Sequence, residues 1–370
     1  MFAQRFAWLV VPMLLATANC SAMTISAHWI SNGQLPTSTS CPEFTALNEL
    51  ESTFWFASGG CLLRARSNGA DPDLFVGPNM VVEGIAATGR DHIWAVGING
   101  KGKRIWGEIA EWQGGSWNRG RPSRWGLSDA FLFAGMESTR SGEALAFGQF
   151  TSSGDAAIAR VNEGGWVAVS TPSLGKARLR ALSFASDGCA WVLGRRPDGS
   201  LLIGKFNGDW QTVGSSEVVD DVTSVSAVSC DEAWFGGTAL LHYREGLWER
   251  LQLPPDTLLR SVASCGGDSV LAAGMGHPLA GSTGDSRGVA FRVVGGRVES
   301  MEMEIPLGMA AWSIRSIACS ADAIWAIAKS ESAKPARATL PLLFHLESGV
   351  LRYRPWSHSR WQYYLNVLLR

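Results

Sequence analysis

The stretch Ile93-Trp94-Ala95-Val96-Gly97 is one copy of a short apolar unit that recurs along the chain. Close variants stand at 190–194 and 233–236, and looser ones are centred near residues 55, 145, 271 and 325. Successive centres are 39, 51, 46, 43, 37 and 54 residues apart. A period of about 40 to 50 residues built from strand-like units is typical of a β-propeller. The repeat therefore predicts an all-β, seven-bladed β-propeller.

The surroundings of each unit predict the content of a blade. A strand of small and apolar residues precedes the unit, a short polar turn leads into it, and a third strand follows. In the stretches 109–117 and 158–166 that third strand runs into a glycine turn followed by Trp. Gly-Gly and Asn-Gly pairs accept the positive φ that tight hairpins need. Each repeat should therefore form four antiparallel strands.

The repeats resemble several bacterial propeller repeat families. The Asp-x-x-Trp-x-x-Gly pattern, as in Asp91 to Gly97, is similar to the sensor propellers of two-component regulators and to Trp-Ala-Val-Gly repeats of secreted proteins. Gly-Gly followed by Trp, as in Gly164-Gly165-Trp166, is similar to kelch repeats. The resemblance covers roughly residues 41 to 356, and it implies a fold. It implies no activity, because propellers host many unrelated functions.

The N-terminal segment has the features of a secretory signal. Arg5 precedes the apolar run 6–15, which is too short to span a bilayer, and Ala16-Thr17-Ala18 fits a cleavage site. We expect residues 1–22 to be a signal peptide and 23–370 to be a single β-propeller domain in the periplasm or outside the cell. The stretch 17–20 also resembles a lipobox, which leaves open a lipid anchor at Cys20. No other segment is long and apolar enough to cross a membrane.

Removal of Cys20 with the leader would leave six cysteines. An even number in an exported chain favours disulfides. The candidates are Cys41, Cys61, Cys189, Cys230, Cys265 and Cys319. Cys41 with Cys61 is the most local pairing, and the other four fall between the first and second strands of successive blades. Bridges between blades require Cα atoms within about 7 Å. Small buried thiols are the alternative, and no pair has metal-binding Cys-x-x-Cys spacing.

Closure of the ring should use strands near the chain ends. The segment 24–30 can supply one such strand. The aromatic tail 361–369 can supply another or pack over the last blade.

The longer connections are expected between strands two and three and between consecutive blades, which places them at one end of the ring. They are the stretches 98–104, 118–129, 276–288 and 330–341. Long loops on a rigid scaffold often carry function. These loops carry more basic than acidic residues, although the net charge of the chain is −1. The candidate partner-binding residues are Arg119, Arg121, Arg124, Trp125, Lys101, Lys103, Arg104, Arg195, Arg196, His277, Asp285 and Arg287.

These features favour an exported binding or scaffold module that meets an anionic glycan or protein partner. In this hypothesis Trp125 stacks on a sugar or anchors a protein contact. The alternatives are a glycan-processing hydrolase or lyase at the axial mouth, with Asp285, His277 and Asp198 as its candidates, and an envelope scaffold lipoprotein. No catalytic residue, metal site or cofactor is expected, and the near-neutral charge argues against nucleic acid as a partner.

Overall fold

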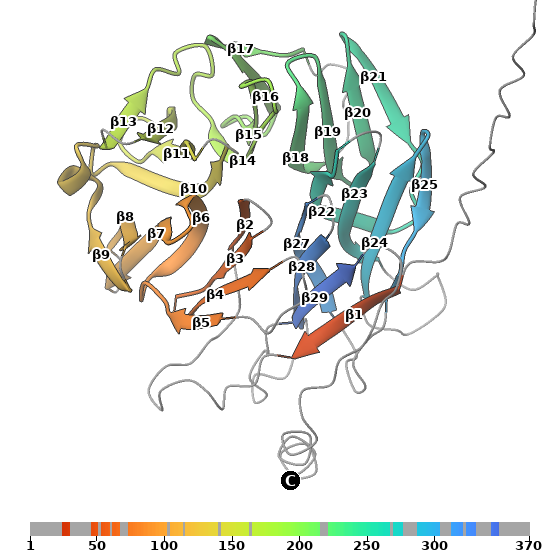
Figure 1. The fold of residues 1–370 in the computed structure, drawn as a ribbon. Coiled ribbons are helices and arrows are strands. Elements are labelled where there is room, and N and C mark those ends of the chain that lie inside the picture. The colour runs from red at the N-terminus through yellow and green to blue at the C-terminus, as the bar shows by residue number, and fades with distance from the viewer. Residues whose placement is uncertain are drawn as a thin grey trace, which may run out of the picture.

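Sheets arranged around a common axis form the ring of this protein (Figure 1). The computed structural model describes residues 24–29, 46–50, 53–59, 61–66, 73–101, 104–113, 115–139, 142–162, 165–214, 221–266, 269–276, 287–303, 312–320, 323–330 and 342–347. Within these residues lie seven sheets, six of them with four strands and one with five.

Blades 1 to 6 are the four-stranded sheets, each antiparallel and each built from four consecutive strands. Blade 1 contains β2 (Ala46–Leu50), β3 (Thr53–Ala57), β4 (Cys61–Arg66) and β5 (Asp73–Val76). Blade 2 contains β6 (Val81–Gly89), β7 (His92–Lys101), β8 (Arg104–Gln113) and β9 (Ser116–Gly120). Blade 3 contains β10 (Phe131–Ser138), β11 (Ala144–Phe150), β12 (Ala156–Asn162) and β13 (Gly165–Val169).

The next three blades repeat this arrangement. Blade 4 contains β14 (Arg178–Phe184), β15 (Ala190–Arg195), β16 (Leu201–Asn207) and β17 (Asp209–Thr212). Blade 5 contains β18 (Val222–Ser229), β19 (Glu232–Gly237), β20 (Leu240–Arg244) and β21 (Leu247–Leu251). Blade 6 contains β22 (Thr257–Ser264), β23 (Val270–Gly276), β24 (Arg287–Val294) and β25 (Arg297–Ser300).

The closing sheet is composite. Its strands are β27 (Trp312–Cys319), β28 (Ala323–Ser330), β29 (Leu342–Glu347), the N-terminal strand β1 (Thr24–Trp29) and the two-residue β26 (Glu302–Met303), in the order β26-β1-β29-β28-β27. β1 is antiparallel to β29 and parallel to β26. Figure 1 shows the red β1 beside the blue β29. The chain start thus completes the ring, as predicted for the segment 24–30.

The predicted set of seven four-stranded antiparallel blades is therefore wrong. Six sheets have that form, whereas the seventh has five strands and includes a parallel pair. The repeated units do not reveal this difference, because β1 and β26 come from outside the last repeat. Their pairing is decided only when the ring closes.

The repeated apolar unit forms the second strand of every sheet, namely β3, β7, β11, β15, β19, β23 and β28. Its aromatic residues are core, as Trp55, Trp191 and Trp325 are 1%, 0% and 2% exposed. Burying roughly 200 Å² of a Trp side chain contributes at most about 5 kcal/mol. Each unit therefore contributes strongly to the packing between neighbouring sheets.

Blade 1 and the closing sheet pack directly on each other. The rings of Phe54 and Phe56 lie 6.1 and 5.7 Å from the ring of Trp325, centroid to centroid. All three side chains belong to one buried cluster with Ile327 and Leu63. The ring is therefore closed by an apolar core of the same kind that joins the other blades.

The first strand of each sheet lies innermost, where it contacts the first strand of the next sheet. Six of these seven strands contain a β-bulge: β6, β10, β14, β18, β22 and β27. Each bulge lies opposite the end of the repeated unit, or directly after it in β19, and the residues at these positions are Gly97, Gly148, Gly194, Gly237, Gly274 and Ala328.

The bulge brings the innermost strand close to the glycine that lies opposite it. A Cβ added at Gly97 would collide with the carbonyl oxygen of Val81, and one added at Gly237 would collide with that of Asp221. Glycine at these two positions lets the two backbones approach without such a collision, whereas the closing sheet forms its bulge opposite Ala328. The recurrent Gly therefore maintains a backbone shape on the innermost strand next to it.

Serine hydroxyls join adjacent innermost strands across the second half of the ring. Each accepts a hydrogen bond from a backbone N–H of the following blade. These bonds run from Ala227 to Ser183 (3.0 Å), from Ser264 to Ser226 (2.8 Å) and from Ile317 to Ser261 (3.1 Å). These bonds fix the position of one innermost strand relative to the next along the axis of the ring.

Two disulfides join neighbouring sheets at the end of the ring that carries the turns between first and second strands. Cys189–Cys230 joins blades 4 and 5, and Cys265–Cys319 joins blade 6 to the closing sheet. Their Cα atoms are 5.2 and 5.4 Å apart, within the expected limit. Cys61 is also disulfide-bonded. Its predicted pairing with Cys41 stays a prediction, because Cys41 lies outside the described residues.

Several expectations fall on parts of the chain that the structure does not describe. These are the signal peptide at residues 1–22, the lipid anchor at Cys20, the tail 361–369 and the connection 331–341. Among the described residues, no helix is long and apolar enough to span a membrane.

Candidate functional site

The predicted residues Arg119, Arg121, Arg124 and Trp125 lie together on blade 2 and the connection that follows it. Arg119 is in β9, and a short 3-10 helix, η2 (Pro122–Trp125), follows directly. The connection is well anchored, because the backbone N–H of Ser123 donates to the Asp129 carboxylate at 2.9 Å. That hydrogen bond, together with one from the Ser123 side chain, holds the pKa of Asp129 below its usual value. The expected long loop is a compact turn.

Arg119 links blade 2 to the connection that enters it. Its Nη1 donates to the carbonyl oxygens of Pro78 at 2.9 Å and Asn79 at 2.8 Å, in the connection that enters blade 2. Its Nε lies 3.7 Å from Oε1 of the buried Glu108, whose Oε2 accepts from Asn99 at 2.5 Å. These contacts occupy most of the guanidinium donors, so Arg119 mainly stabilises the local structure.

Trp125 packs into the protein. It is half-buried, its ring meets that of Trp94 edge to face at 5.1 Å, and its Nε1 is buried with no hydrogen-bond partner among the described residues. Arg124 lies over the Trp125 ring at 5.7 Å, and its Nη1 donates to the carbonyl oxygen of Arg119 at 2.7 Å. Trp94 and Arg124 therefore both contact the Trp125 ring, and its stacking role stays a prediction.

The stretch 98–104 is a hairpin and not a loop. β7 and β8 remain paired as far as Lys101 and Arg104, beyond the start of β6 at Val81. Arg104 is exposed, and Lys103 lies outside the described residues. Two residues absent from the sequence prediction follow: Ile105, which is 61% exposed, and the half-buried Trp106.

Arg121 brings this hairpin and the 3-10 turn together. Its guanidinium lies over the Trp106 ring, 5.0 Å from the centroid, and its side chain is 58% exposed. We call Arg104, Ile105, Trp106 and Arg121 the blade-2 patch. It combines two exposed cations with an exposed aliphatic side chain and an aromatic ring. In sequence, its signal was the Arg104-Ile105-Trp106 triplet at a hairpin tip.

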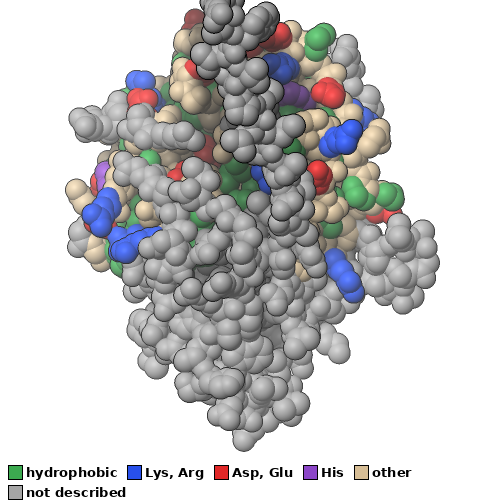
Figure 2. Space-filling model, turned by 45° about the vertical axis from the view of Figure 1, so that its right-hand side comes forward, with side chains coloured by type: hydrophobic (Ala, Val, Ile, Leu, Met, Phe, Trp, Pro, Cys, Tyr) green, Lys and Arg blue, Asp and Glu red, His purple; other side chains and the backbone are tan. Residues whose placement is uncertain are grey.

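Arg195, Arg196 and Arg287 lie on other blades and do not join this patch. Arg195 pairs with Asp221 and donates to the carbonyl oxygen of Gly199 at 2.9 Å, while Arg196 donates to that of Leu201 at 3.1 Å. Arg287 is exposed at the start of β24. His277 and Asp285 lie outside the described residues. Figure 2 shows Lys and Arg interspersed with Asp and Glu on the described surface of that view, so no uniformly basic face is visible there.

Asp198, a candidate for hydrolytic chemistry, belongs to a turn. Its Oδ1 accepts from the backbone N–H of Ser200 at 2.9 Å. Hydrogen bonds from the Ser200 side chain and backbone hold the pKa of Asp198 below its usual value. A carboxylate stabilised in this way is poorly suited to act as a general acid.

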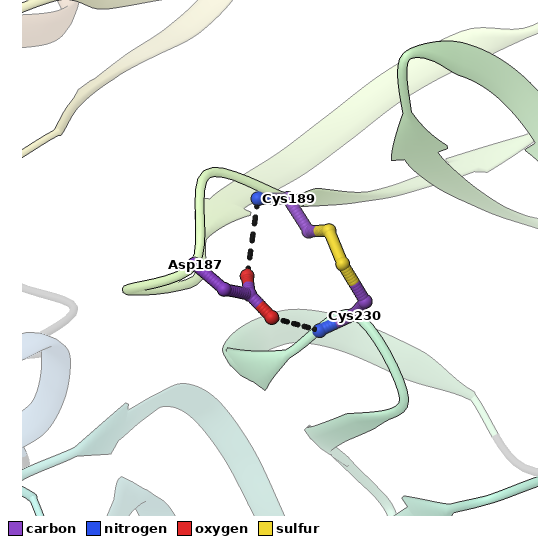
Figure 3. Close-up of side chains that lie close together, drawn as sticks. All are labelled: Asp187, Cys189 and Cys230. Atoms are coloured by element: carbon purple, nitrogen blue, oxygen red, sulfur yellow. Dashed lines mark hydrogen bonds between the residues drawn. A yellow bond between two sulfur atoms is a disulfide. The ribbon is translucent and has the colours of Figure 1, made fainter.

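Among the described residues, one group of side chains has the residue types that could bind a metal ion, and two of its members form a disulfide. The Asp187 carboxylate accepts from the backbone N–H of Cys189 at 3.1 Å and from that of Cys230 at 2.8 Å (Figure 3). The two sulfur atoms are bonded to each other, so neither is a thiolate ligand. The group therefore fastens blade 4 to blade 5.

The innermost strands carry charged residues that the sequence prediction did not include. We call Glu49, Glu83 and Glu137, on β2, β6 and β10, the acidic arc. We call Arg180, Arg260 and Arg315, on β14, β22 and β27, the basic arc. Arg260 and Arg315 interrupt apolar runs ten and nine residues before the start of the repeated unit, which is the sequence signal that could have revealed them.

Within the acidic arc, the protein shifts two carboxyl groups toward their neutral forms. Burial, with the nearby Glu49 carboxylate adding to it, raises the pKa of Glu137 to about 8. Burial also raises the pKa of Glu83, while Arg178 on β14 lowers it. Nearby, the Asn48 side-chain oxygen accepts from Ala87 N at 3.0 Å and from Ser138 Oγ at 3.1 Å. Blades 1, 2 and 3 therefore meet at this side of the axis.

Comparison with known proteins supports the fold. No protein-family model matches the chain, and no curated sequence matches it significantly. Among solved structures, it is similar to YCF48 bound to a D1 peptide, with TM-score 0.59 and 13% identity over 89% of this chain and 100% of that chain. It is also similar to the RRP9 WD40 repeats, with TM-score 0.57 and 12% identity over 88% and 99%. U3-55K gives TM-score 0.53 and 12% identity over 86% and 98%. The chain thus has the β-propeller fold.

Proposed function

We propose that this protein is an exported β-propeller binding module that contacts an acidic protein segment through the blade-2 patch. The observation that carries the proposal is the stacking of Arg121 on Trp106 beside the exposed Ile105 and Arg104. Arginine and aromatic residues are enriched at the anchoring points of protein interfaces. A guanidinium already placed over a ring loses little freedom when it binds a carboxylate.

Export is the second part of the proposal. It is supported by the signal-like N-terminal segment and by disulfides between sheets, which persist in oxidising compartments. A peptide is the first partner to test, because a structurally similar propeller, YCF48, has been solved with a D1 peptide. An acidic glycan remains the alternative for the same cations.

The test uses a fluorescent Glu-rich peptide containing one Trp, with polygalacturonate as the glycan probe. We expect the peptide to bind the mature protein, and the Arg104→Glu/Arg121→Glu double variant to weaken binding at least about tenfold. Trp106→Ala should weaken it by a similar factor. Arg244→Glu is the control, since Arg244 is exposed at the opposite end of the ring, at the β20–β21 turn.

Three results are decisive. Peptide affinity that is lost in the patch variants and kept in the Arg244 variant would support the proposal. Affinity for polygalacturonate alone would replace the protein partner with a glycan. Equal binding by the wild type and the double variant would refute the role of the patch.

A further inference from the structure

The outer strand of blade 3, β13, lacks the features that usually protect the edge of a sheet. Exposed edges are commonly protected by charged side chains, prolines or bulges. The sequence of β13, Gly165-Trp166-Val167-Ala168-Val169, contains no charged residue and no proline, and the strand pairs with β12 in unbroken register. Figure 1 shows β13 at the rim of the ring, outside β12. This edge is therefore chemically open to an added strand.

The outermost strands of the other six sheets all carry charge. The charged residues are Asp73 in β5, Arg119 in β9, Asp209 in β17, Glu249 and Arg250 in β21, Arg297 and Glu299 in β25, and Glu302 in β26. Two of these strands also have a carbonyl oxygen occupied by a side chain. Arg119 O accepts from Arg124 Nη1 at 2.7 Å, and Trp210 O accepts from Ser173 Oγ at 2.5 Å. The edge of blade 3 thus differs from those of its neighbours.

The backbone of β13 has hydrogen-bonding groups on its outer side. In an antiparallel pair, only alternate residues direct their N–H and C=O groups toward the partner strand. Within the described part of the chain, the backbone groups of residues 165–169 make no hydrogen bond outside the pairing with β12. Gly126, at the end of η2, lies beside the carbonyl oxygen of Trp166. The open part of the edge therefore begins at Val167.

The side chains of β13 hold the strand in place and expose an aliphatic group. Trp166 is 7% exposed, and its ring lies 5.4 Å from that of Trp94 and 6.5 Å from that of Phe133, centroid to centroid. Val167 next to it is 51% exposed, and Ala168 is exposed as well. A strand that is already fixed loses little conformational freedom when it binds.

We propose that β13 binds an extended, uncharged segment of a partner protein, which adds a fifth strand to blade 3. Backbone hydrogen bonds supply affinity in this mode of recognition, and side-chain contacts supply selectivity. Val167 is the contact that this edge offers. The cation opposite it, Arg160 on β12, lies 3.9 Å from the Glu143 carboxylate, so this part of the blade is close to neutral. A neutral edge fits a neutral segment, because a charged side chain would lose hydration there without gaining a partner.

A second copy of the chain is a less suitable occupant. Pairing of two β13 strands would involve five residues from each copy. Stable protein interfaces use about 20 to 30 residues a side. Recognition by strand addition needs only a short segment. The site is separate from the blade-2 patch, which lies on a different blade and carries cations.

The test titrates the full mature chain with a fluorescein-labelled Thr-Val-Thr-Val-Thr peptide with blocked ends. The same peptide with N-methylated amides cannot donate backbone hydrogen bonds. We expect the unmodified peptide to bind, and either N-methylation or Val167→Lys to weaken binding at least about tenfold. Val167→Thr keeps a β-branched, uncharged side chain and should bind within about threefold of wild type. Leu247→Lys is the matched control, because Leu247 is 76% exposed on an edge strand that already carries charge, and its affinity should match wild type.

Hydrogen exchange locates the bound peptide. Exchange should slow in residues 165–169 and stay unchanged in β21. Protection elsewhere, no binding of the unmodified peptide, or binding that survives N-methylation or Val167→Lys would overturn the proposal. Sedimentation velocity without peptide covers the alternative, since a dimer that Val167→Lys dissociates would replace the partner segment with a second copy. The Arg104→Glu/Arg121→Glu variant should retain peptide affinity, which separates this site from the proposed function.

Discussion

Glu83 of the acidic arc and Arg180 of the basic arc occupy the same kind of backbone position but carry opposite charge. Bulges at equivalent positions place Glu83 on blade 2 and Arg180 on blade 4. In both blades the bulge lies opposite a glycine of the repeated unit, Gly97 or Gly194. The repeat thus preserves a main-chain shape and leaves the axial side chain free to vary. The residues that define the repeat are therefore distinct from the charged residues at the bulges.

Disulfides join the blades near the basic arc, and their removal is the largest predicted effect. Both fully described disulfides join sheets that carry or border the basic arc. Replacing Cys189 and Cys230 by Ser should lower the free energy of unfolding by about 2 to 5 kcal/mol. Urea denaturation measures this loss.

Hydrogen exchange in the same variant shows which blades lose stability. Protection should fall in β14 to β21 and remain unchanged in β6 to β12, because the bridge joins blades 4 and 5 only. Uniform loss of protection around the ring would show that the two halves do not unfold separately.

The second prediction concerns the glycines that lie opposite the bulges. Gly97→Ala on the acidic side and Gly237→Ala on the other side should each destabilise the protein by about 3 kcal/mol, since the new Cβ meets a carbonyl oxygen of the innermost strand. Thermal unfolding compares them with Gly214→Ala, where a Cβ meets nothing within 4 Å. If all three variants behave alike, the bulge is not what the glycine maintains.

The third prediction concerns the acidic arc alone. Burial raises the pKa of Glu137 to about 8 in the folded protein, from 4.5 for an exposed Glu in the unfolded chain. Between these two pH values the native state keeps a proton that the unfolded chain releases. Stability should therefore decline as the pH rises from about 4.5 to about 8, by a few kcal/mol in total. Glu137→Gln removes this decline, and the variant should exceed wild type in stability above pH 8.

Urea denaturation at pH 5 and pH 8.5 tests that window. The exposed Glu143, replaced by Gln, should retain the pH dependence of the wild type. A Glu137→Gln variant that loses stability with pH as the wild type does would show that this carboxyl group is not the cause.

Two of the predicted contact residues have partners within the protein that the sequence did not indicate. Arg119 and Trp125 looked like surface contacts in a variable connection, but Arg119 bonds carbonyl oxygens about 40 residues away and Trp125 packs on Trp94. Partners so distant in sequence cannot be identified from local composition. By contrast, Arg121 remains exposed, because its stacking partner Trp106 lies at the tip of a projecting hairpin.

The amino-acid sequence by itself determined the β-propeller fold, the strand order within each blade and the four cysteines at equivalent turns. These follow from local periodicity, turn chemistry and spacing, which depend on residues near one another in the chain. Only the tertiary structure decided the five-stranded closing sheet, the pairing of those four cysteines and the grouping of charges around the axis. Each of these depends on which strands meet when the ring closes, and closure joins segments that are hundreds of residues apart.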